Sequence, residues 1–195
     1  MRIKPEFDVR DVAFARELVR AHPFATIVTP GLRATHMPCL VDESDEGLTV
    51  LSHVARADPA CEELDGPLLM IFHGPHGYVS ASWYGEDTIP TWNNITLHVW
   101  GTPERFDDSM DVVRRTVDHF EARVERPWSL DRLGPTAREM ADQVVAFRVR
   151  AQDWHAEAKL SQDKPDDERQ RVVAGLEGSG PYANAPLAAA VRSAP

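Results

Sequence analysis

The hydrophobic positions of this chain first follow a helical spacing and then a two-residue alternation. A first helix is predicted over residues 8–21, where apolar residues recur every three or four positions and His22-Pro23 ends the segment. Short β-branched runs bounded by Pro, Gly and Asp turn signals follow, and each predicts a strand. The predicted strands cover residues 24–32, 33–41, 47–54, 68–72, 76–84, 93–101 and 144–151.

One predicted strand shows its two faces clearly. In residues 93–101 the apolar side chains fall on one face, and the polar and aromatic side chains fall on the other. The face predicted to be buried consists of Ile95, Leu97 and Val99. The opposite face is expected to present Thr96, His98 and Trp100.

Four further helices are predicted around these strands. They are expected at residues 57–64, 107–124 and 136–141, and from Pro165 onward, where acidic residues occupy the first turn. Residues 179–195 are predicted to form a loosely held short helix or tail. Together the elements predict a mainly β, α+β fold, an antiparallel barrel with peripheral helices in one domain over residues 1–178.

The stretch from Ile71 to Trp100 has a composition typical of a ligand site. It holds three of the five tryptophans and three of the eight histidines, interleaved with Gly, Pro, Ser and Asn. Aromatic bodies with polar tips among small residues favour a planar ligand. A set of core aromatics in a small β-domain explains the same composition, and both interpretations stay open at this point.

Composition and charge narrow the function classes. The 195 residues carry a net charge of −10, so binding of nucleic acid would need a local basic patch, and none of convincing density is present. No apolar run approaches the roughly 20 residues of a membrane span. The N-terminus lacks the apolar stretch of a signal peptide, and we expect a cytoplasmic protein. Cys39 and Cys61 show no metal-binding spacing and are expected to be reduced thiols.

Three short segments hold groups that could bind a ligand. Arg56 in SHVARADP lies between a predicted strand and a helix start, where a phosphate could meet a guanidinium and free N–H groups. KLSQD places Lys159 beside another helix start, and TWNN offers the indole of Trp92 for stacking. A surface ion pair, a capping segment and a core tryptophan are the respective alternatives.

Histidine pairs were considered as metal ligands. His73 with His76 and His36 with His53 have suitable residue types, but no cysteine or carboxylate completes a zinc set by spacing. We therefore predict no metal site. No residue is required to be a general acid or base; His36, His53 and His98 are candidates, and the catalytic residues are left open.

Taken in order, seven segments resemble the PaiB-like family, whose members are often labelled FMN-binding negative transcriptional regulators. The segments are ATHMP, SHVARADP, IFHGPHGYVSASWY, IPTWNN, HVWG, RPWS and KLSQDKP, which span most of residues 1–178. The resemblance implies the flavin-reductase-like split-barrel fold. It also implies a homodimer with flavin mononucleotide (FMN) at the subunit interface.

The resemblance implies roles for the residues of this chain that match the motifs of the family. Arg56 and Lys159 would hold the phosphate of FMN. Trp92, Asn93 and the backbone of residues 53–55 would lie near the ring, and part of the pocket would come from the partner subunit. The full set implied by the resemblance is His53, Val54, Ala55, Arg56, Ser80, Trp92, Asn93, Lys159, Ser161 and Gln162.

The chain departs from the family pattern at four positions. Asp58 and Asp163 stand where the family usually has Asn, Asn94 replaces a Tyr, and Ala81 replaces a Pro. Two added negative charges near a phosphate weaken anion binding unless they point away or cap helices. Replacing the tyrosine by Asn94 removes an aromatic ring from the expected flavin pocket.

Three functions are compatible with the sequence. The first is an FMN-binding protein, plausibly a small flavin-dependent oxidoreductase. The second is a haem-binding protein or biosynthetic haem enzyme, with His53 or His73 as axial ligand. The third is a transcriptional regulator without redox activity, although direct nucleic-acid binding is disfavoured because neither a helix-turn-helix nor a basic patch is evident.

Overall fold

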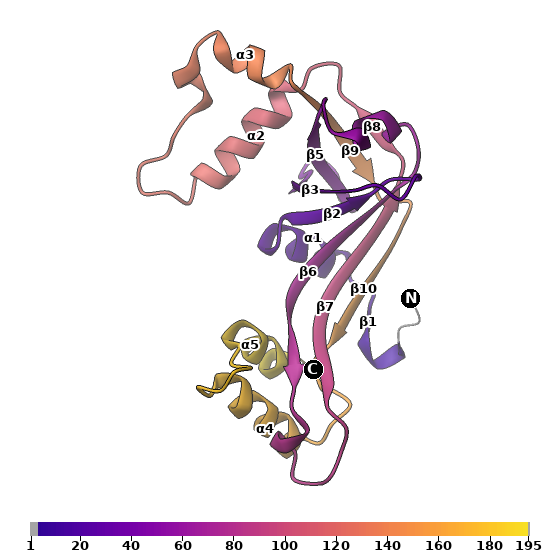
Figure 1. Cartoon of the computed structure of the whole chain (residues 1–195), viewed down its shortest axis with the longest axis vertical. Coiled ribbons are helices and arrows are strands. Elements are labelled where there is room, and N and C mark those ends of the chain that lie inside the picture. Colours follow the sequence, from indigo (N-terminus) through magenta and orange to yellow (C-terminus); the bar gives the residue numbers. More distant parts are fainter. Residues whose placement is uncertain (1–3, 195) are drawn as a thin grey trace. The chain divides into compact units, whose positions relative to one another are not determined.

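A computed structural model describes residues 4–194 of the chain (Figure 1). Its backbone contacts divide it into two compact units, each built from segments that are distant in the sequence. The central unit comprises Val12–Phe72 and His98–Trp154. The terminal unit comprises the described parts of residues 1–11, 73–97 and 155–195. The predicted domain boundary at residue 178 stays a prediction.

The described residues form strands, α-helices and short 3-10 helices. The strands are β1 (Asp8–Val9), β2 (Phe24–Val28), β3 (Ala34–Pro38), β4 (Leu40–Val41), β5 (Thr49–Ala55), β6 (Leu68–Val79), β7 (Thr91–Gly101), β8 (Pro103–Arg105), β9 (Val144–Arg150) and β10 (Asp153–Lys159). The α-helices are α1 (Val12–Ala21), α2 (Met110–Glu121), α3 (Thr136–Ala141), α4 (Asp166–Glu177) and α5 (Ala185–Ser193). The 3-10 helices are η1 (Pro5–Phe7), η2 (Pro59–Glu63), η3 (Ala81–Trp83) and η4 (Leu130–Leu133).

The strands form two sheets. The six-stranded sheet has the order β1-β10-β7-β6-β2-β3, and the four-stranded sheet has the order β4-β5-β9-β8. β5 pairs antiparallel with β9 from Thr49↔Arg150 to Ala55↔Val144, and β2 pairs antiparallel with both β3 and β6. This combination of antiparallel sheets and helices confirms the predicted α+β class.

The core of the central unit packs α2 against the four-stranded sheet. Leu40, Leu51, Val112 and Ala146 form a buried cluster. Ser109 ties the start of α2 to β9, because its hydroxyl donates to the carbonyl of Val144 and accepts from the N–H of Ala146, both at 3.1 Å. Val112 and the partly buried Phe120 therefore place one side of α2 against the sheet.

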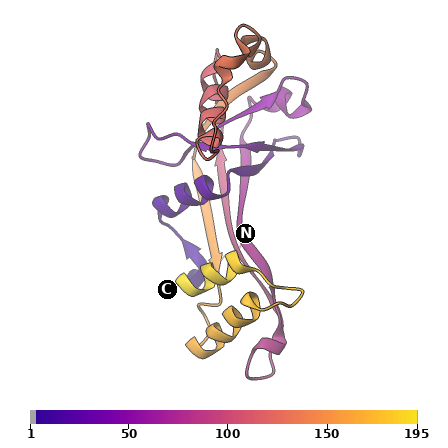
Figure 2. The same cartoon turned by 90° about the vertical axis from the view of Figure 1, so that its left-hand side faces the viewer.

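β7, whose residues 91–97 belong to the terminal unit, shows the alternation that its sequence predicts. Ile95, Leu97 and Val99 are buried, and the residues between them are partly exposed. Helices α4 and α5 lie side by side in the same unit, as both views show (Figure 2). Acidic residues at the start of α4 suit the positive end of its dipole, and α4 begins where the sequence predicts.

Two predicted boundaries near the N-terminus are wrong. Asp8 and Val9 were assigned to the first helix, but they form β1 and pair with Glu157 and Ala156 of β10. Val9 fits an alternating pattern as well as a helical one, so the pairing decides its conformation. The single strand predicted over residues 33–41 is divided at Cys39, directly after Pro38, with β3 and β4 belonging to different sheets.

The glycine- and proline-rich segment after residue 72 also differs from its prediction. Strands predicted at 68–72 and 76–84 are one continuous strand, β6, which passes through Gly74 and Pro75. The last part of the second prediction is η3 instead, because Ser80 accepts a hydrogen bond from the N–H of Ser82 and starts a 3-10 turn. Turn-forming residues signal a turn only where the neighbouring strands do not hold them extended.

The C-terminal segment is a packed helix rather than a loose one. Leu187, Ala188 and Val191 of α5 are fully buried, and Asn184 caps the helix by accepting from the N–H of Leu187 at 3.1 Å. Asn184 also donates to the carbonyl of His76 on β6 at 2.9 Å. Within the described residues, no helix is long and apolar enough to cross a membrane.

Replacing Leu187 by Ala tests whether α5 is part of the folded core. Because the side chain is fully buried, its truncation should lower the free energy of unfolding by about 2–5 kcal/mol. Urea unfolding followed by circular dichroism measures this. Met140→Ala, at a side chain that is 56% exposed on α3, is the control and should change stability by less than about 0.5 kcal/mol. A Leu187→Ala variant as stable as the wild type would contradict the packing of α5.

Candidate cofactor-binding site

The KLSQ segment forms a tight turn at the end of β10. Ser161 has a φ of +63°, in the left-handed region, although it is not glycine. The Gln162 side chain stabilises this turn: Oε1 accepts from the N–H of Leu160 at 2.7 Å, and Nε2 donates to the carbonyl of Ala158. Nε2 also reaches the carbonyl of Glu6 at 3.1 Å. Gln162 therefore organises the turn and attaches the N-terminal segment to it.

A buried hydrogen bond joins this turn to β7. Asn93 Nδ2 donates to Ser161 Oγ at 2.8 Å, and the two residues are 0% and 3% exposed. Asn93 Oδ1 is also buried, and it accepts no hydrogen bond from the described residues. Unsatisfied buried acceptors are rare in proteins, so this oxygen is notable at a candidate ligand site.

A cavity of about 370 Å³ lies beside this hydrogen bond, within the range typical of ligand pockets. Thr91 and Lys159 meet in its wall, where the ammonium donates to Thr91 Oγ1. Residues near the N-terminus, from β7 and the segment before it, and from β10 and the turn after it line it: Lys4, Phe7, Tyr84, Thr88, Ile89, Thr91, Asn93, Glu157, Lys159, Ser161, Asp163 and Lys164. We call it the lysine cavity.

The lysine content of the chain is concentrated in this cavity. The sequence contains three lysines among its 21 basic residues, and all three line the cavity: Lys4, Lys159 and Lys164. Glu157 and Asp163 are the carboxylates of the lining, so the lining has a net charge of +1 in a chain of net charge −10. This local excess of ammonium groups suits an anionic ligand.

Tyr84 brings a phenol to the same wall. Tyr84 lines the cavity together with Ser161, and its ring lies 6.0 Å from the Lys164 ammonium. Burial raises the pKa of Tyr84, and the negative charges of Asp163 and Glu168 raise it further, while the polar Ser161 side chain acts in the opposite direction. Tyr84 is therefore a neutral phenol at physiological pH.

The backbone around Tyr84 is held on both sides. The N–H of Tyr84 donates to the carbonyl of Ala81, and the N–H of Gly85 donates to the Glu168 carboxylate at 3.0 Å. Trp83 packs so closely on α4 that a Cβ at Gly175 would collide with its indole ring. These contacts fix the segment that carries the phenol.

The predicted residues of the SHVARADP segment belong to the central unit. Arg56 is exposed, and its Nε donates to the carbonyl of Asp142 at 2.6 Å. Asp58 caps η2 by accepting from the N–H of Ala60, and it also accepts from Thr35. The charge of Asp58 is therefore used in capping. His53 has a lowered pKa because it is largely buried, and its Nδ1 has no partner among the described residues.

Other predicted residues lie outside the lining of the lysine cavity. Trp92 is 51% exposed and stacks on His76 with 6.0 Å between ring centroids. Ser80 caps η3 and lines a different cavity with Trp83 and Gly175. Of the predicted site residues, the structure brings together Asn93, Lys159 and Ser161 in the lining, with Gln162 in the same turn.

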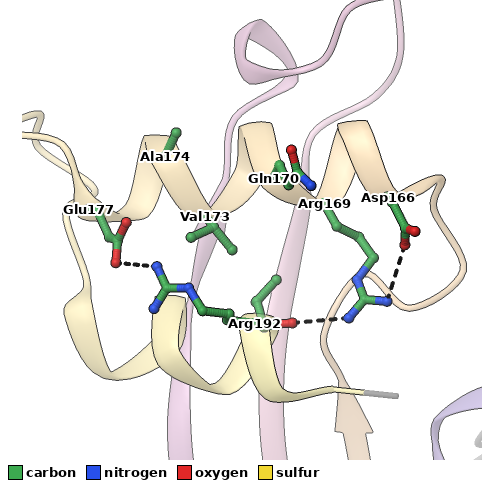
Figure 3. Close-up of a pocket in the computed structure, with 8 residues that line it drawn as sticks. Asp166, Arg169, Gln170, Val173, Ala174, Glu177 and Arg192 are labelled. Atoms are coloured by element: carbon green, nitrogen blue, oxygen red, sulfur yellow. Dashed lines mark hydrogen bonds and ion pairs between the residues drawn. The ribbon is translucent and has the colours of Figure 1, made fainter.

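A cavity between α4 and α5 offers no free charged groups comparable to the ammonium groups of the lysine cavity (Figure 3). Glu177 pairs with Arg192, and Arg169 donates to the carbonyls of Val191 and Ala194 at the end of α5. These charged groups stabilise the helix pair. Among residues 4–194, no group of three or more His, Cys, Asp or Glu side chains could hold a metal ion.

Residues 1–153 match the family described as "Putative FMN-binding domain". The chain belongs to this family. A curated relative is "Protease synthase and sporulation protein PAI 2" of Bacillus subtilis, 28% identical, with the match covering 91% of this chain and 89% of the relative. This similarity confirms the PaiB-like resemblance.

Solved structures confirm the fold expected of the family, a split barrel. The flavocytochrome Anf3 of Azotobacter vinelandii matches with a TM-score of 0.65 at 14% identity, covering 87% of this chain and 78% of that one. The FAD and Heme binding protein of Mycobacterium smegmatis matches with a TM-score of 0.58 at 15% identity, covering 92% and 83%. At these identities the likeness concerns the fold alone.

Sequence reasoning missed part of the lysine cavity. Lys4, Thr91 and Lys164 were not predicted as site residues, and Tyr84 was matched to a family motif without a role. The scarcity of lysine was an available signal, since two of the three lysines flank the LSQ turn. The family match ends at residue 153, so the turn itself lies beyond the matched region.

The left-handed conformation of Ser161 predicts a difference between two substitutions. Ser161→Gly and Ser161→Ala both remove the hydroxyl that Asn93 needs, which costs about 1–3 kcal/mol. Alanine also carries the strain of a positive φ, so Ser161→Ala should be less stable than Ser161→Gly by about 1 kcal/mol. Denaturant unfolding of both variants measures the difference. Equal stability, or a more stable Ala variant, would contradict the conformation described.

Proposed function

We propose that this protein is an FMN-binding protein that uses the lysine cavity as part of its flavin site. The observation that carries the proposal is the gathering of all three lysines around the buried Asn93–Ser161 hydrogen bond. Ammonium groups bind phosphate as point charges, and the family to which the chain belongs is described as FMN-binding. The fold likeness to the flavocytochrome Anf3 agrees with this proposal.

In this proposal Lys159 holds the phosphate, and Lys4 and Lys164 add to the positive potential. Asn93 would face the ring system, because its buried Oδ1 is free to accept from a ring N–H. Ser161 and Gln162 would close the pocket through the turn they form. Asp163, which is exposed, and Glu157 are the lining carboxylates that would oppose the phosphate.

We further propose a homodimer in which the second copy completes the site. Arg56, with the backbone of residues 53–55, would come from one protomer and the KLSQ turn from the other. Trp92 and Ile89 support this, since they are 51% and 82% exposed in the unit that holds the cavity. Exposed large apolar side chains near a site favour a covering partner.

Bound FMN would supply electron and hydride transfer, which makes a small flavin-dependent oxidoreductase the reaction class we propose. The chain would contribute binding and orientation. Lysine ammonium groups would neutralise the phosphate, the Asn93 amide would fix the ring edge, and Phe7 and Ile89 would exclude water from the apolar side of the cavity.

Absorption spectroscopy and FMN titration test the flavin site. The protein should show a flavin spectrum that denaturation releases, and both Lys159→Ala and Arg56→Ala should weaken FMN binding about tenfold or more, because each removes a charge-assisted bond. Arg138→Ala, which removes the same charge from an exposed ion pair with Asp108, is the control. Unchanged affinity in both test variants would overturn the phosphate assignment.

Lysine acylation gives a second readout from the same samples. Since every lysine lines the cavity, FMN should protect the lysines while the α-amino group continues to react. Acylation that FMN does not slow would argue against occupation of the lysine cavity.

Mixing two variants tests the shared site. If Arg56 and Lys159 come from different protomers, a mixed dimer of Arg56→Ala and Lys159→Ala chains contains one intact site and one doubly altered site. Tight FMN binding should therefore return at one site per mixed dimer. If both groups come from one protomer, no tight site returns.

Light scattering should give twice the 21.8 kDa of one chain, and a monomer would refute the dimer.

Haem binding is a second candidate, and His53 is the observation that favours it. Burial lowers the pKa of His53, so its imidazole stays neutral and able to ligate iron, and its Nδ1 lacks a partner among the described residues. His73 is exposed and is the weaker candidate. One of the similar solved structures is named a FAD and Heme binding protein.

Haem titration separates the two cofactors. In the haem interpretation a Soret band should appear on adding haem, and His53→Ala should lose it while His73→Ala keeps it. The pKa of His53 is lowered, so ligation should persist on acidification below the usual histidine range. A protein that binds neither cofactor would refute both candidates.

The regulator named by the family label is the remaining candidate. A chain of net charge −10 repels nucleic acid overall, and many of its arginines pair with carboxylates. Direct DNA binding would require a sequence-specific, salt-dependent mobility shift. A regulatory role exerted through a bound small molecule would not require such a shift.

A further inference from the structure

The strand β4 is an edge of the four-stranded sheet, and it leaves backbone groups unpaired. Val41 lies opposite Val50 of β5. The N–H of Asp42 donates to the carbonyl of Thr49 at 2.9 Å, which makes the Val41 pair one of the non-hydrogen-bonded pairs of an antiparallel ladder. The N–H and C=O of Val41 therefore point away from β5, and no other described residue bonds to them. The open edge of β4 presents one free donor and one free acceptor.

A cavity of about 300 Å³ lies at this edge in the central unit, and Val41 lines it together with Cys39 and Leu40. The side chain of Leu40 packs with Val112 of α2 in the buried cluster. Because side chains alternate along a strand, that of Val41 points to the face of the sheet opposite α2. Residues of α2 line the same cavity, so Val41 borders it through its backbone. We call this space the β4 cavity.

Arg115 of α2 brings a loosely paired guanidinium to the β4 cavity. Its carboxylate partners, Asp42 and Asp111, lie at 3.5 and 4.0 Å. The neighbouring Arg114 pairs with Asp131 at 2.7 Å, which is the usual length of a charge-assisted hydrogen bond. Arg115 therefore keeps N–H donors for a further acceptor, and the planar fork of a guanidinium matches a carboxylate.

The other polar groups of the lining differ in how far they are used. Arg20 of α1 donates to both oxygens of the Glu43 carboxylate at 3.0 Å, so these two charges neutralise each other. Asp118 is exposed, where water and salt screen its charge. His119 has a buried Nε2 without a hydrogen-bond partner among residues 4–194, which is rare in proteins. The lining therefore has unused hydrogen-bonding capacity beside the apolar side chain of Leu40.

We propose that the β4 cavity binds a small organic acid. The carboxylate of the acid accepts from the N–H of Val41 and from the guanidinium of Arg115, and its apolar body lies against Leu40. The volume of the cavity is at the lower end of the range of ligand pockets, which suits a small molecule. Every group in this proposal belongs to the central unit, so the proposal is independent of the flavin site proposed for the lysine cavity.

Benzoate, benzamide and benzamidine test the charge of the ligand, because they share one shape and carry a negative, a neutral and a positive group. The amide proton of Val41, followed by NMR, reports binding at the edge of β4. Benzoate should move this resonance downfield in a saturable titration, and it should bind about tenfold or more tightly than benzamide. Benzamidine should leave the resonance in place. Equal binding of the three, a preference for benzamidine, or no movement with benzoate would overturn the proposal.

Replacing Arg115 by Gln removes the guanidinium and keeps a polar helical side chain. The affinity for benzoate should fall about tenfold or more, because a charge-assisted hydrogen bond is lost. Arg114→Gln is the matched control, since it makes the same change one residue earlier in α2 and outside the lining, and it should bind like the wild type. Circular dichroism checks that both variants fold. Equal affinity of two folded variants would overturn the role of Arg115, and the Val41 resonance of the wild type decides the site if Arg115→Gln does not fold.

Discussion

The hydrogen bond between Asn93 and Ser161 is the interaction on which the candidate site depends. It joins the start of β7 to the turn after β10, and both of its partners are buried. The left-handed conformation of Ser161 costs about 1–2 kcal/mol, and the bond to Asn93 together with the Gln162 contacts offsets it. Because the turn is fixed in this way, the lysines on either side of it face one cavity.

Charge is the second constraint on the site. Arginine provides most of the positive charge of the chain, and many arginines pair with nearby carboxylates in forks that suit their planar group. The three lysines line a cavity in which they outnumber the carboxylates of the lining, and Lys4 also pairs with Glu6 at 3.4 Å. A compact ammonium suits a phosphate, whereas a guanidinium would fill the same space with a larger, planar group.

Local patterns in the sequence predicted those features of the fold that local interactions determine. The faces of β7, the bounds of α3 and the start of α4 follow from alternation, periodicity and capping. The joining of two predicted strands into β6, and the division of residues 33–41 between two sheets, depend on partners distant in the sequence. Lys4 could not be placed near Lys159 for the same reason, and a serine gives no sign of a positive φ.

Gly175 shows how the last helices complete the site. A glycine within a helix costs about 1 kcal/mol relative to alanine, but any Cβ at this position of α4 would collide with Trp83. The close approach of α4 also lets Glu168 hold the N–H of Gly85, and these two contacts flank Tyr84. The family match over residues 1–153 includes Tyr84 and Asn93 but not the KLSQ turn or α4. The segment after residue 153 supplies two of the three ammonium groups of the lysine cavity and, through Glu168, holds the backbone next to Tyr84.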